Sequence, residues 1–364
     1  MEILTIVGAR PQFVKAAVIS REIAKHNRAN GAQIREVMVH TGQHYDANMS
    51  DIFFLEMGIP KPNYHLNIGG GTHGAMTGQM LERIESVLFQ EKPDAVLVYG
   101  DTNSTLAGAL AASKLHIPVA HVEAGLRSFN MKMPEEINRV LTDHVAKWLF
   151  CPTATAVDNL YKEGFSGDNR RRVLNVGDVM YDAALYYKGI SKPSESIRTL
   201  MESLKGGFFL ATVHRAENTD FPERLSPIIK ALARIAQDTP VVLPLHPRTK
   251  KHIDSRMLVG LNVIDPVGYF DMLGLLNGCT GVFTDSGRVQ KEAYFFGKPC
   301  VTLRDETEWL ELVNIGVNVL AGADEQRILK SAKSISTLDS KYDPSLYGEG
   351  DAGRRIISEL LASA

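Results

Sequence analysis

The chain has 364 residues, of which 44% are hydrophobic and 23% charged, and its formal net charge at pH 7 is −2. This length is enough for two domains with sizeable cores, and the small net charge argues against nucleic acid or an anionic membrane surface as the main partner. Cys151, Cys279 and Cys300 lack metal-ligand spacing and adjoin apolar runs, so we expect buried, reduced thiols rather than a metal site or a catalytic cysteine.

The first predicted element is the run EILTIVG, which reads as a strand rather than as a signal peptide. Buried strands follow at REVMVH, DAVLVYG, IPVAHVEA and KWLFCP, and the segments between them predict helices near 11–28, 72–92, 101–115 and 134–147. No apolar run approaches about 18 residues, so we expect no membrane partner and a cytoplasmic location.

The helix predicted at 134–147 has clear start signals. Pro134 takes the first helical position, and Glu135 and Glu136 lie in the first turn, where carboxylates are favourable. The apolar residues that follow helical spacing, as in an amphipathic helix, are Ile137, Val140, Leu141, Val145 and Trp148.

A second alternating series begins at VLNVG and continues with GFFLATVH, TPVVLPLHP, LNVID, GVFTD, PCVTL and VNVL. Such alternation predicts an α/β fold with parallel sheets, and two successive series predict two doubly wound, Rossmann-like domains rather than one barrel. We place the first domain at 1–175, the second at 176–349, and at 350–364 a final helix that packs back on the first domain.

Polar segments directly follow seven of the apolar runs: GARPQ, TGQHYD, GDTNST, HVEAGLR, TVHRAEN, LHPRT and TDSGRVQKE. In open parallel sheets, ligands bind beyond the carboxyl ends of the strands. Seven such segments at equivalent places therefore predict a site in a cleft between two sheets.

The segment GARPQ lacks the GxGxxG fingerprint, which disfavours a nicotinamide dinucleotide enzyme. Arg10 and Lys15 instead offer cations beside a helix N-terminus, which suits an anionic ligand. The alternative is a pair of solvated surface charges, but Arg10 precedes the helix rather than lying on its outer face.

Three carboxylates could carry acid and base chemistry in the first domain. Asp101 follows the strand DAVLVYG, Glu123 ends the strand PVAHVEAG, and Glu135 opens the next helix. If adjacent strand ends bring them together, clustered carboxylates raise one another's pKa values, which suits proton transfer near neutral pH. The alternatives are that Asp101 caps a helix and that Glu135 only complements the helix dipole.

In the second domain, His214 and Arg215 end the strand FFLATVH, and His246 and Arg248 follow TPVVLPL in the same way. A histidine in such a place can titrate near neutrality and can also donate to a phosphate. A lone histidine at a strand end is more often structural, but two beside a phosphate-type loop favour a ligand.

The loop TDSGRVQKEA presents Ser286 and Gly287 at the start of a helix expected at 287–296, with Gly297 as its stop. Glu292, one turn further on, suits a pair of ribose hydroxyls, so the loop fits a nucleoside diphosphate. Arg288 stands where a second glycine is expected. If the position needs a positive φ, the arginine strains the backbone by about 1–2 kcal/mol. If it does not, the guanidinium adds a bidentate contact to the phosphates.

Other site types lack their signatures. No GxxxxGK[ST] loop, metal-binding cluster or GxSxG elbow is present, which argues against an NTPase, a metal site and a serine hydrolase. The motifs GARPQ, GDTNSTLAG, HVEAGLRSFN, PEEINR, TVHRAEN, LHPRT and DSG-VQKEA together resemble the non-hydrolysing UDP-N-acetylglucosamine 2-epimerases, in order and along nearly the whole chain.

This resemblance implies the two-domain glycosyltransferase-B architecture, with a UDP-sugar in the interdomain cleft. It also implies a reaction in which UDP is eliminated to leave a glycal and is then added back, which inverts C2 without a cofactor or metal. Asp101, Glu123 and Glu135 would transfer protons, while Arg10, Lys15 and His214 would hold the leaving diphosphate. The other residues expected to bind the substrate are Arg139, Arg215, His246, Ser286, Gly287, Arg288 and Glu292.

The leading prediction is therefore a UDP-N-acetylglucosamine 2-epimerase, homodimeric as is usual in the family, with a place in polysaccharide biosynthesis. SFNMKMPEEINR and QKEAYFFGKPCVTLRDETEW look closer to the branch that acts on UDP-2,3-diacetamido-2,3-dideoxy-glucuronate, which is the first alternative. A hydrolysing relative, a glycosyltransferase of the same architecture and a catalytically silent nucleotide-sugar binding protein are the others.

Overall fold

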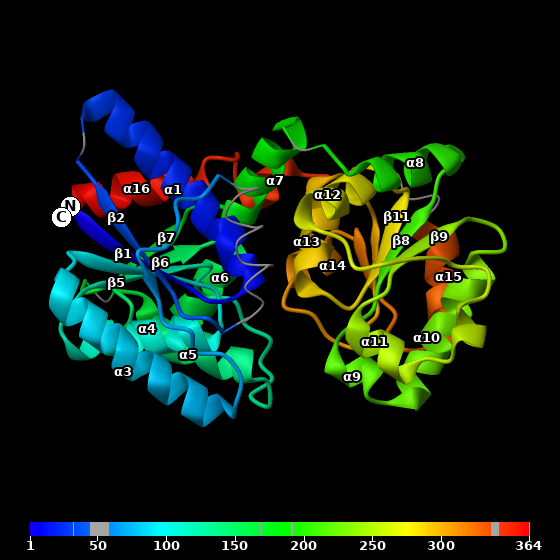
Figure 1. Ribbon diagram of the computed structural model, residues 1–364, viewed down its shortest axis with the longest axis horizontal. Helices are drawn as coiled ribbons and strands as arrows, with labels where there is room; N and C mark the ends of the chain where they lie inside the picture. The colour runs from blue at the N-terminus through cyan, green and yellow to red at the C-terminus, as the bar shows by residue number, and fades with distance from the viewer. Residues whose placement is uncertain (32, 44–57, 168, 191, 336–341, 364) are drawn as a thin grey trace. The chain divides into compact units, whose positions relative to one another are not determined.

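The protein is described by a computed structural model, which covers the chain except for residues 32, 44–57, 168, 191, 336–341 and 364 and the side chains at 10 and 344. Contacts divide the chain into two compact units, the first formed by 1–183 with 345–364 and the second by 184–344. Each unit contains its own parallel sheet (Figure 1).

The sheet of the first unit has the strand order β3-β2-β1-β4-β5-β6-β7, and all its neighbours pair in parallel. Its strands are β1 (Glu2–Val7), β2 (Arg35–His40), β3 (Tyr64–His65), β4 (Ala95–Tyr99), β5 (Val119–Val122), β6 (Trp148–Cys151) and β7 (Arg172–Asn175). The order reverses between β1 and β4, which makes this the switch point where a doubly wound sheet binds its ligand.

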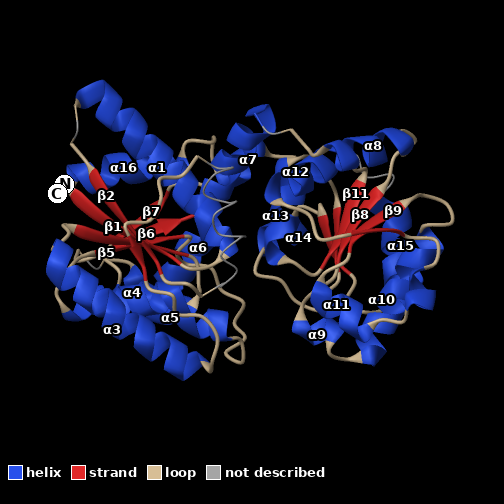
Figure 2. Ribbon diagram, in the orientation of Figure 1, coloured by secondary structure: helices blue, strands red, loops and turns tan. Residues whose placement is uncertain are grey.

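Helices cover both faces of this sheet, with α1 and α16 on one face and α3, α4 and α5 on the other (Figure 2). The helices of this unit are α1 (Arg10–Asn30), α3 (His73–Glu91), α4 (Asn103–Lys114), α5 (Pro134–Val145), α6 (Ala154–Leu160), a π-helix (Tyr161–Phe165) and α16 (Ala352–Ala362). The boundaries between the units fall within α7 (Val179–Ile190) and within a 3-10 turn (Pro344–Tyr347). The final helix α16 lies along α1, so the end of the chain belongs to the first unit.

The second unit repeats the pattern with the parallel order β10-β9-β8-β11-β12-β13 and a switch point between β8 and β11. Its strands are β8 (Phe209–Thr212), β9 (Val241–Pro244), β10 (Asn262–Ile264), β11 (Gly281–Thr284), β12 (Cys300–Thr302) and β13 (Asn318–Leu320). Its helices are α8 (Glu195–Ser203), α9 (Ala216–Thr219), α10 (Pro222–Ile235), α11 (Pro247–His252), a 3-10 turn (Ser255–Leu258), α12 (Tyr269–Gly278), α13 (Gly287–Phe295), α14 (Leu310–Asn314) and α15 (Glu325–Ile335).

The predicted fold class is confirmed, but two expectations about single elements are wrong. The run VLNVG does not open the second series, because β7 pairs with β6 at the edge of the first sheet, with Val173 opposite Leu149. Trp148 does not continue the apolar spacing of α5, because it begins β6. Both errors concern how neighbouring segments pair in space, which a local pattern does not encode.

The inward face of α5 is polar. Ile137 and Leu141, part of the expected apolar face, are 39% and 44% exposed. The residues that α5 buries instead are Glu136, Asn138, Arg139, Thr142 and Asp143. Burying such groups is tolerable only when they find hydrogen-bond and charge partners. This helix therefore brings a polar network, rather than a hydrophobic stripe, towards the site.

Cys151, Cys279 and Cys300 are buried and free, as expected from the sequence. Burial raises the pKa of the Cys279 and Cys300 thiols to about 12, so they remain protonated at neutral pH. In the part of the chain that the structure describes, no helix is long and apolar enough to cross a membrane.

Candidate active site

The turn after β1 is fixed by one side chain. Gln12 Oε1 accepts from the backbone N–H groups of Gly8 and Ala9 at 2.8 and 3.0 Å, and its Nε2 donates to the carbonyl oxygen of Tyr99 at 2.7 Å. Gly8 has room for no side chain, because a Cβ there would collide with the hydroxyls of Thr41 and Ser104. The ends of β1 and β4 are thus held together at the switch point.

The ends of β4 and β5 place two of the predicted carboxylates side by side. Tyr99 pairs with Val122, so Gly100 and Asp101 leave the sheet next to Glu123. A Cβ added at Gly100 would lie 3.3 Å from Oε2 of Glu123. Glu123 has a φ of +75°, a conformation that costs a residue with a side chain free energy and that is concentrated at functional sites.

Asp101 does not cap a helix. The N-cap of α4 is Thr102, whose hydroxyl accepts from the N–H of Thr105. The capping alternative is therefore wrong, because the chain continues for one more residue before the helix begins. The Asp101 carboxylate is instead directed to Arg139 of α5, with which it forms an ion pair.

Glu123 is paired with Lys15 of α1, and both side chains are nearly buried, with exposures of 11% and 7%. Asp101 and Glu123 are thus each set against a cation, whereas the sequence led us to expect carboxylates clustered with one another. Arg10 begins α1, but its side chain lies outside the described residues. The same holds for 44–46 of the segment TGQHYD.

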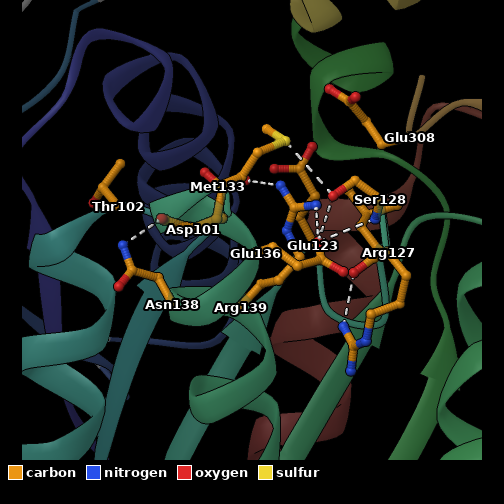
Figure 3. A network of polar contacts seen from close by, with 12 residues as sticks. Asp101, Thr102, Glu123, Arg127, Ser128, Met133, Glu136, Asn138, Arg139 and Glu308 are labelled. Carbon is orange, nitrogen blue, oxygen red and sulfur yellow. Dashed lines mark hydrogen bonds and ion pairs between the residues drawn. The ribbon is translucent and has the colours of Figure 1, made fainter. Parts of the chain in front are cut away.

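Glu135 and Glu136 differ sharply although they are adjacent. Glu135 is half-buried and makes no hydrogen bond or ion pair within the described chain. Glu136 is 1% exposed, and its Oε2 accepts from Nη1 of Arg139 at 2.8 Å. Figure 3 shows Asp101, Arg139 and Glu136 within one polar network.

A second buried network, which we did not predict, supports the turn behind Asp101. His121 of β5 contacts Asp143 through Nδ1 at 2.6 Å and the carbonyl oxygen of Gly100 through Nε2 at 2.7 Å. Arg127 donates to the other oxygen of Asp143 at 2.7 Å and pairs with Glu163. Polar letters inside the apolar patterns VAHV and INRVLTDHV were the signal that could have revealed these residues.

In the second unit, the central residue is Asp285, which sequence reasoning also missed. It follows β11 and is fully buried. Its carboxylate accepts from the backbone N–H groups of His214 and Arg215 at 3.0 Å and from Nδ2 of Asn218 at 3.2 Å. One carboxylate thereby fixes the turn after β8, as Gln12 fixes the turn after β1.

The two predicted histidines lie together. The rings of His214 and His246 are 5.5 Å apart between centroids, and His214 Nδ1 lies 3.5 Å from Asp285. Burial lowers the pKa of His214 below its ordinary value; His246, Arg215 and Arg288 act in the same direction and Asp285 opposes them. His246 also caps α11, where its Nδ1 accepts from the N–H of Arg248 at 3.2 Å.

The predicted phosphate loop forms the start of α13. Ser286 is the N-cap, with its hydroxyl accepting from the N–H of Val289, and a Cβ at Gly287 would collide with Oε1 of Glu308. Arg288 is helical and absent from the residues with positive φ, so it carries no strain of that kind. Its Nε lies 3.5 Å from the fully buried carboxylate of Glu292.

The two units, each taken by itself, offer different chemical groups. The second unit offers a helix N-terminus with a capping hydroxyl, two histidines and an arginine, while the first unit offers carboxylates set against cations. Among the described residues, no group of three or more His, Cys, Asp or Glu side chains could hold a metal ion.

Comparison with known proteins decides the family. A model of the UDP-N-acetylglucosamine 2-epimerases matches residues 26–361. The chain belongs to this family. The prediction made from its motifs is confirmed, and the protein is an enzyme of a class that acts on carbohydrates.

Two members of this family and one protein that shares only the fold show how similar the chain is to known proteins. The chain is 57% identical over 362 residues to the UDP-2,3-diacetamido-2,3-dideoxy-D-glucuronate 2-epimerase of Pseudomonas aeruginosa PAO1, with 99% of each chain covered. The crystal structure of Methanocaldococcus jannaschii UDP-GlcNAc 2-epimerase in complex with UDP-GlcNAc and UDP covers 100% of both chains, with a TM-score of 0.89 and 42% identity. A UGT transferase from Siraitia grosvenorii in complex with UDP has a TM-score of 0.58 over 99% of each chain at 11% identity, which shows the glycosyltransferase-like fold alone.

Proposed function

We propose that this epimerase inverts C2 of UDP-2,3-diacetamido-2,3-dideoxy-D-glucuronate. The observation that carries the choice of sugar is the 57% identity to the Pseudomonas enzyme of that name, against 42% to the Methanocaldococcus enzyme crystallised with UDP-GlcNAc. UDP-N-acetylglucosamine, which the sequence favoured, is the second candidate, because the protein crystallised with that sugar has a TM-score of 0.89 over the whole chain.

The reaction proceeds by elimination and re-addition. A base takes the proton from C2, the C2–H electrons form the C1=C2 double bond, and UDP leaves with the electrons of the C1–O bond. UDP then adds back to C1 while C2 receives a proton on the opposite face. Asp101, Glu123 and Glu135 are the acid and base groups, and the strained backbone of Glu123, which lies next to Asp101 at the end of β5, supports this role.

The second unit holds UDP. The N-terminal turn of α13, with Ser286 and Gly287, receives the diphosphate, and Glu292 receives the ribose hydroxyls. Arg288 adds a cation to the phosphates, which its helical conformation and 23% exposure support. The remaining diphosphate and sugar contacts are assigned to Arg10, Lys15, Arg139, His214, Arg215 and His246. The homodimer, the cytoplasmic location and a place in polysaccharide biosynthesis stay predictions.

The test is to incubate the enzyme with each UDP-sugar in heavy water, without an acceptor, and to follow C2 by NMR. We expect deuterium at C2 and the inverted nucleotide sugar, with higher kcat/KM for the diacetamido-glucuronate. Incorporation from UDP-GlcNAc alone would move the assignment to the second candidate, and no incorporation from either would contradict epimerisation. Free UDP formed in step with product would indicate a hydrolysing enzyme, and turnover only with an added acceptor a glycosyltransferase.

A further inference from the structure

The first turn of α5 carries a buried carboxylate to which the proposed reaction gives no role. Glu136 is 1% exposed, whereas its neighbour Glu135 is half-buried. A carboxylate buried to this degree is costly unless donors surround it. Its surroundings therefore show what it holds in place.

Glu136 accepts from four donors. Its Oε2 accepts from the backbone N–H and the hydroxyl of Ser128, each at 3.0 Å, and from Nη1 of Arg139 at 2.8 Å. Its Oε1 accepts from the backbone N–H of Phe129 at 2.9 Å. Phe129 has a φ of +59°, so charge-assisted bonds to this carboxylate stabilise a turn with an unfavourable backbone conformation.

The guanidinium of Arg139 joins Glu136 to Asp101. Arg139 is 4% exposed, and while Nη1 donates to Glu136, Nη2 donates to Asp101 (Figure 3). Asn138, the preceding residue, donates to the carbonyl oxygen of Asp101 at 2.9 Å. Consecutive residues of α5 thus hold both the main chain and the carboxylate of Asp101.

We propose that Glu136 is a positioning residue for Asp101, acting through Arg139. By binding one amino group of the planar guanidinium, Glu136 fixes the direction in which the other meets Asp101. It also shares the positive charge of Arg139, so that Asp101, whose side chain is 32% exposed, is not its sole counter-ion and can exchange a proton during the reaction. This proposal rests on the proposed function in giving Asp101 a part in proton transfer.

The decisive variant is Glu136→Gln, with kcat and KM measured across pH. We expect kcat to fall about 10- to 100-fold with KM changed less than about threefold, because a displaced catalytic group loses rate rather than binding. We also expect the acidic limb of kcat/KM to move to lower pH, since Arg139 then pairs with Asp101 alone. An unchanged kcat, or a loss of kcat with an unshifted limb, would overturn the proposal.

Glu91→Gln is the matched control. Glu91 accepts from Nη1 of Arg35 at 3.0 Å in the same unit, and Arg35 also pairs with Glu2, but neither Glu91 nor Arg35 contacts Asp101 or Arg139. The same chemical change there is expected to leave kcat and the pH profile unaltered; a control that copies Glu136→Gln would assign the effect to general loss of charge. If Glu136→Gln does not fold, Arg139→Lys takes its place. Lysine cannot donate to Glu136 and Asp101 in the fixed geometry of a guanidinium, so we expect reduced kcat, and wild-type kcat would contradict the proposal.

A readout without turnover separates this proposal from the proposed function. In thermal unfolding of Asp101→Asn, Glu136→Gln and the double variant, we expect a more than additive loss of Tm, because the two carboxylates share one buried guanidinium. Additive losses would overturn the sharing of Arg139. If the wild-type enzyme epimerises neither sugar, the proposed function is wrong. The comparison of the single and double variants still decides whether the two carboxylates are coupled through Arg139.

Discussion

The two units use different chemical groups at the switch points of their sheets, between β1 and β4 in the first unit and between β8 and β11 in the second. At the switch point of the first unit, the groups that face the site are charged side chains held in ion pairs, such as Glu123 with Lys15. At the switch point of the second unit, the buried Asp285 accepts hydrogen bonds from backbone N–H groups. The group proposed to meet the ligand there is the N-terminus of α13. This difference supports the proposal that the carboxylates of the first unit transfer protons and that the N-terminus of α13 in the second unit binds the diphosphate.

The largest effect is expected from a substitution that changes only the switch point of the first unit. Glu123→Gln removes the charge of a carboxylate held in a strained conformation beside Lys15, so we expect kcat to fall by about 10³-fold or more. UDP affinity should stay within about threefold of wild type, because Glu123 itself is assigned no contact with UDP and the variant keeps Lys15 and the α13 N-terminus. Deuterium exchange at C2 and calorimetric UDP titration measure the two quantities; retained exchange would remove Glu123 from the mechanism.

The corresponding substitution in the second unit is Gly287→Ala, in the first turn of α13. The added methyl would collide with Oε1 of Glu308, so either this carboxylate, which pairs with Arg304, or the first turn of α13 must move, and we expect UDP to bind at least about tenfold more weakly. Gly268→Ala is the control, since Gly268 is the N-cap of α12 in the same unit and has open space around its Cα. Equal UDP affinity in the two variants would show that the α13 turn does not bind the diphosphate.

Arg288 sharpens the comparison, because it adds a charged side chain to the N-terminal turn of α13. Arg288→Gly and Arg288→Ala should each weaken UDP binding by about tenfold or less, the loss expected for a partly exposed charge-assisted contact. The alanine variant separates this loss from the helix-destabilising effect of glycine. Tighter binding in both would show that the arginine obstructs the site.

The smallest expected effect is a pH dependence of UDP binding. Because burial lowers the pKa of His214, the ring is neutral in the folded protein at neutral pH, and a bound diphosphate favours its protonated form. UDP should therefore bind about threefold more tightly at pH 6 than at pH 8, with proton uptake, and His214→Gln should lose this increment. Titration calorimetry in buffers of different ionisation enthalpy measures the uptake. An identical pH dependence in the variant would place the titration on UDP itself or on His246.

Local patterns predicted much of this protein. Strand runs such as EILTIV and AVLVY, the Pro134 helix start and the Ser286 loop all lie where the sequence placed them. These features depend on periodicity, caps and turn residues, whose physics acts within a few neighbours along the chain. The ordered polar segments after the strands were also enough to identify the epimerase family.

Only the tertiary structure decided the partners. Nothing local distinguishes Glu135 from Glu136, yet one is half-buried and the other is enclosed by Ser128, Phe129 and Arg139. The sequence likewise could not assign β7 to the first sheet, because pairing depends on the path of the crossovers. Burial and ion pairing are properties of segments that meet in space, so the sequence determined which chemical groups the site has, and the packing of α5, β4 and β5 decided which of them act on one another.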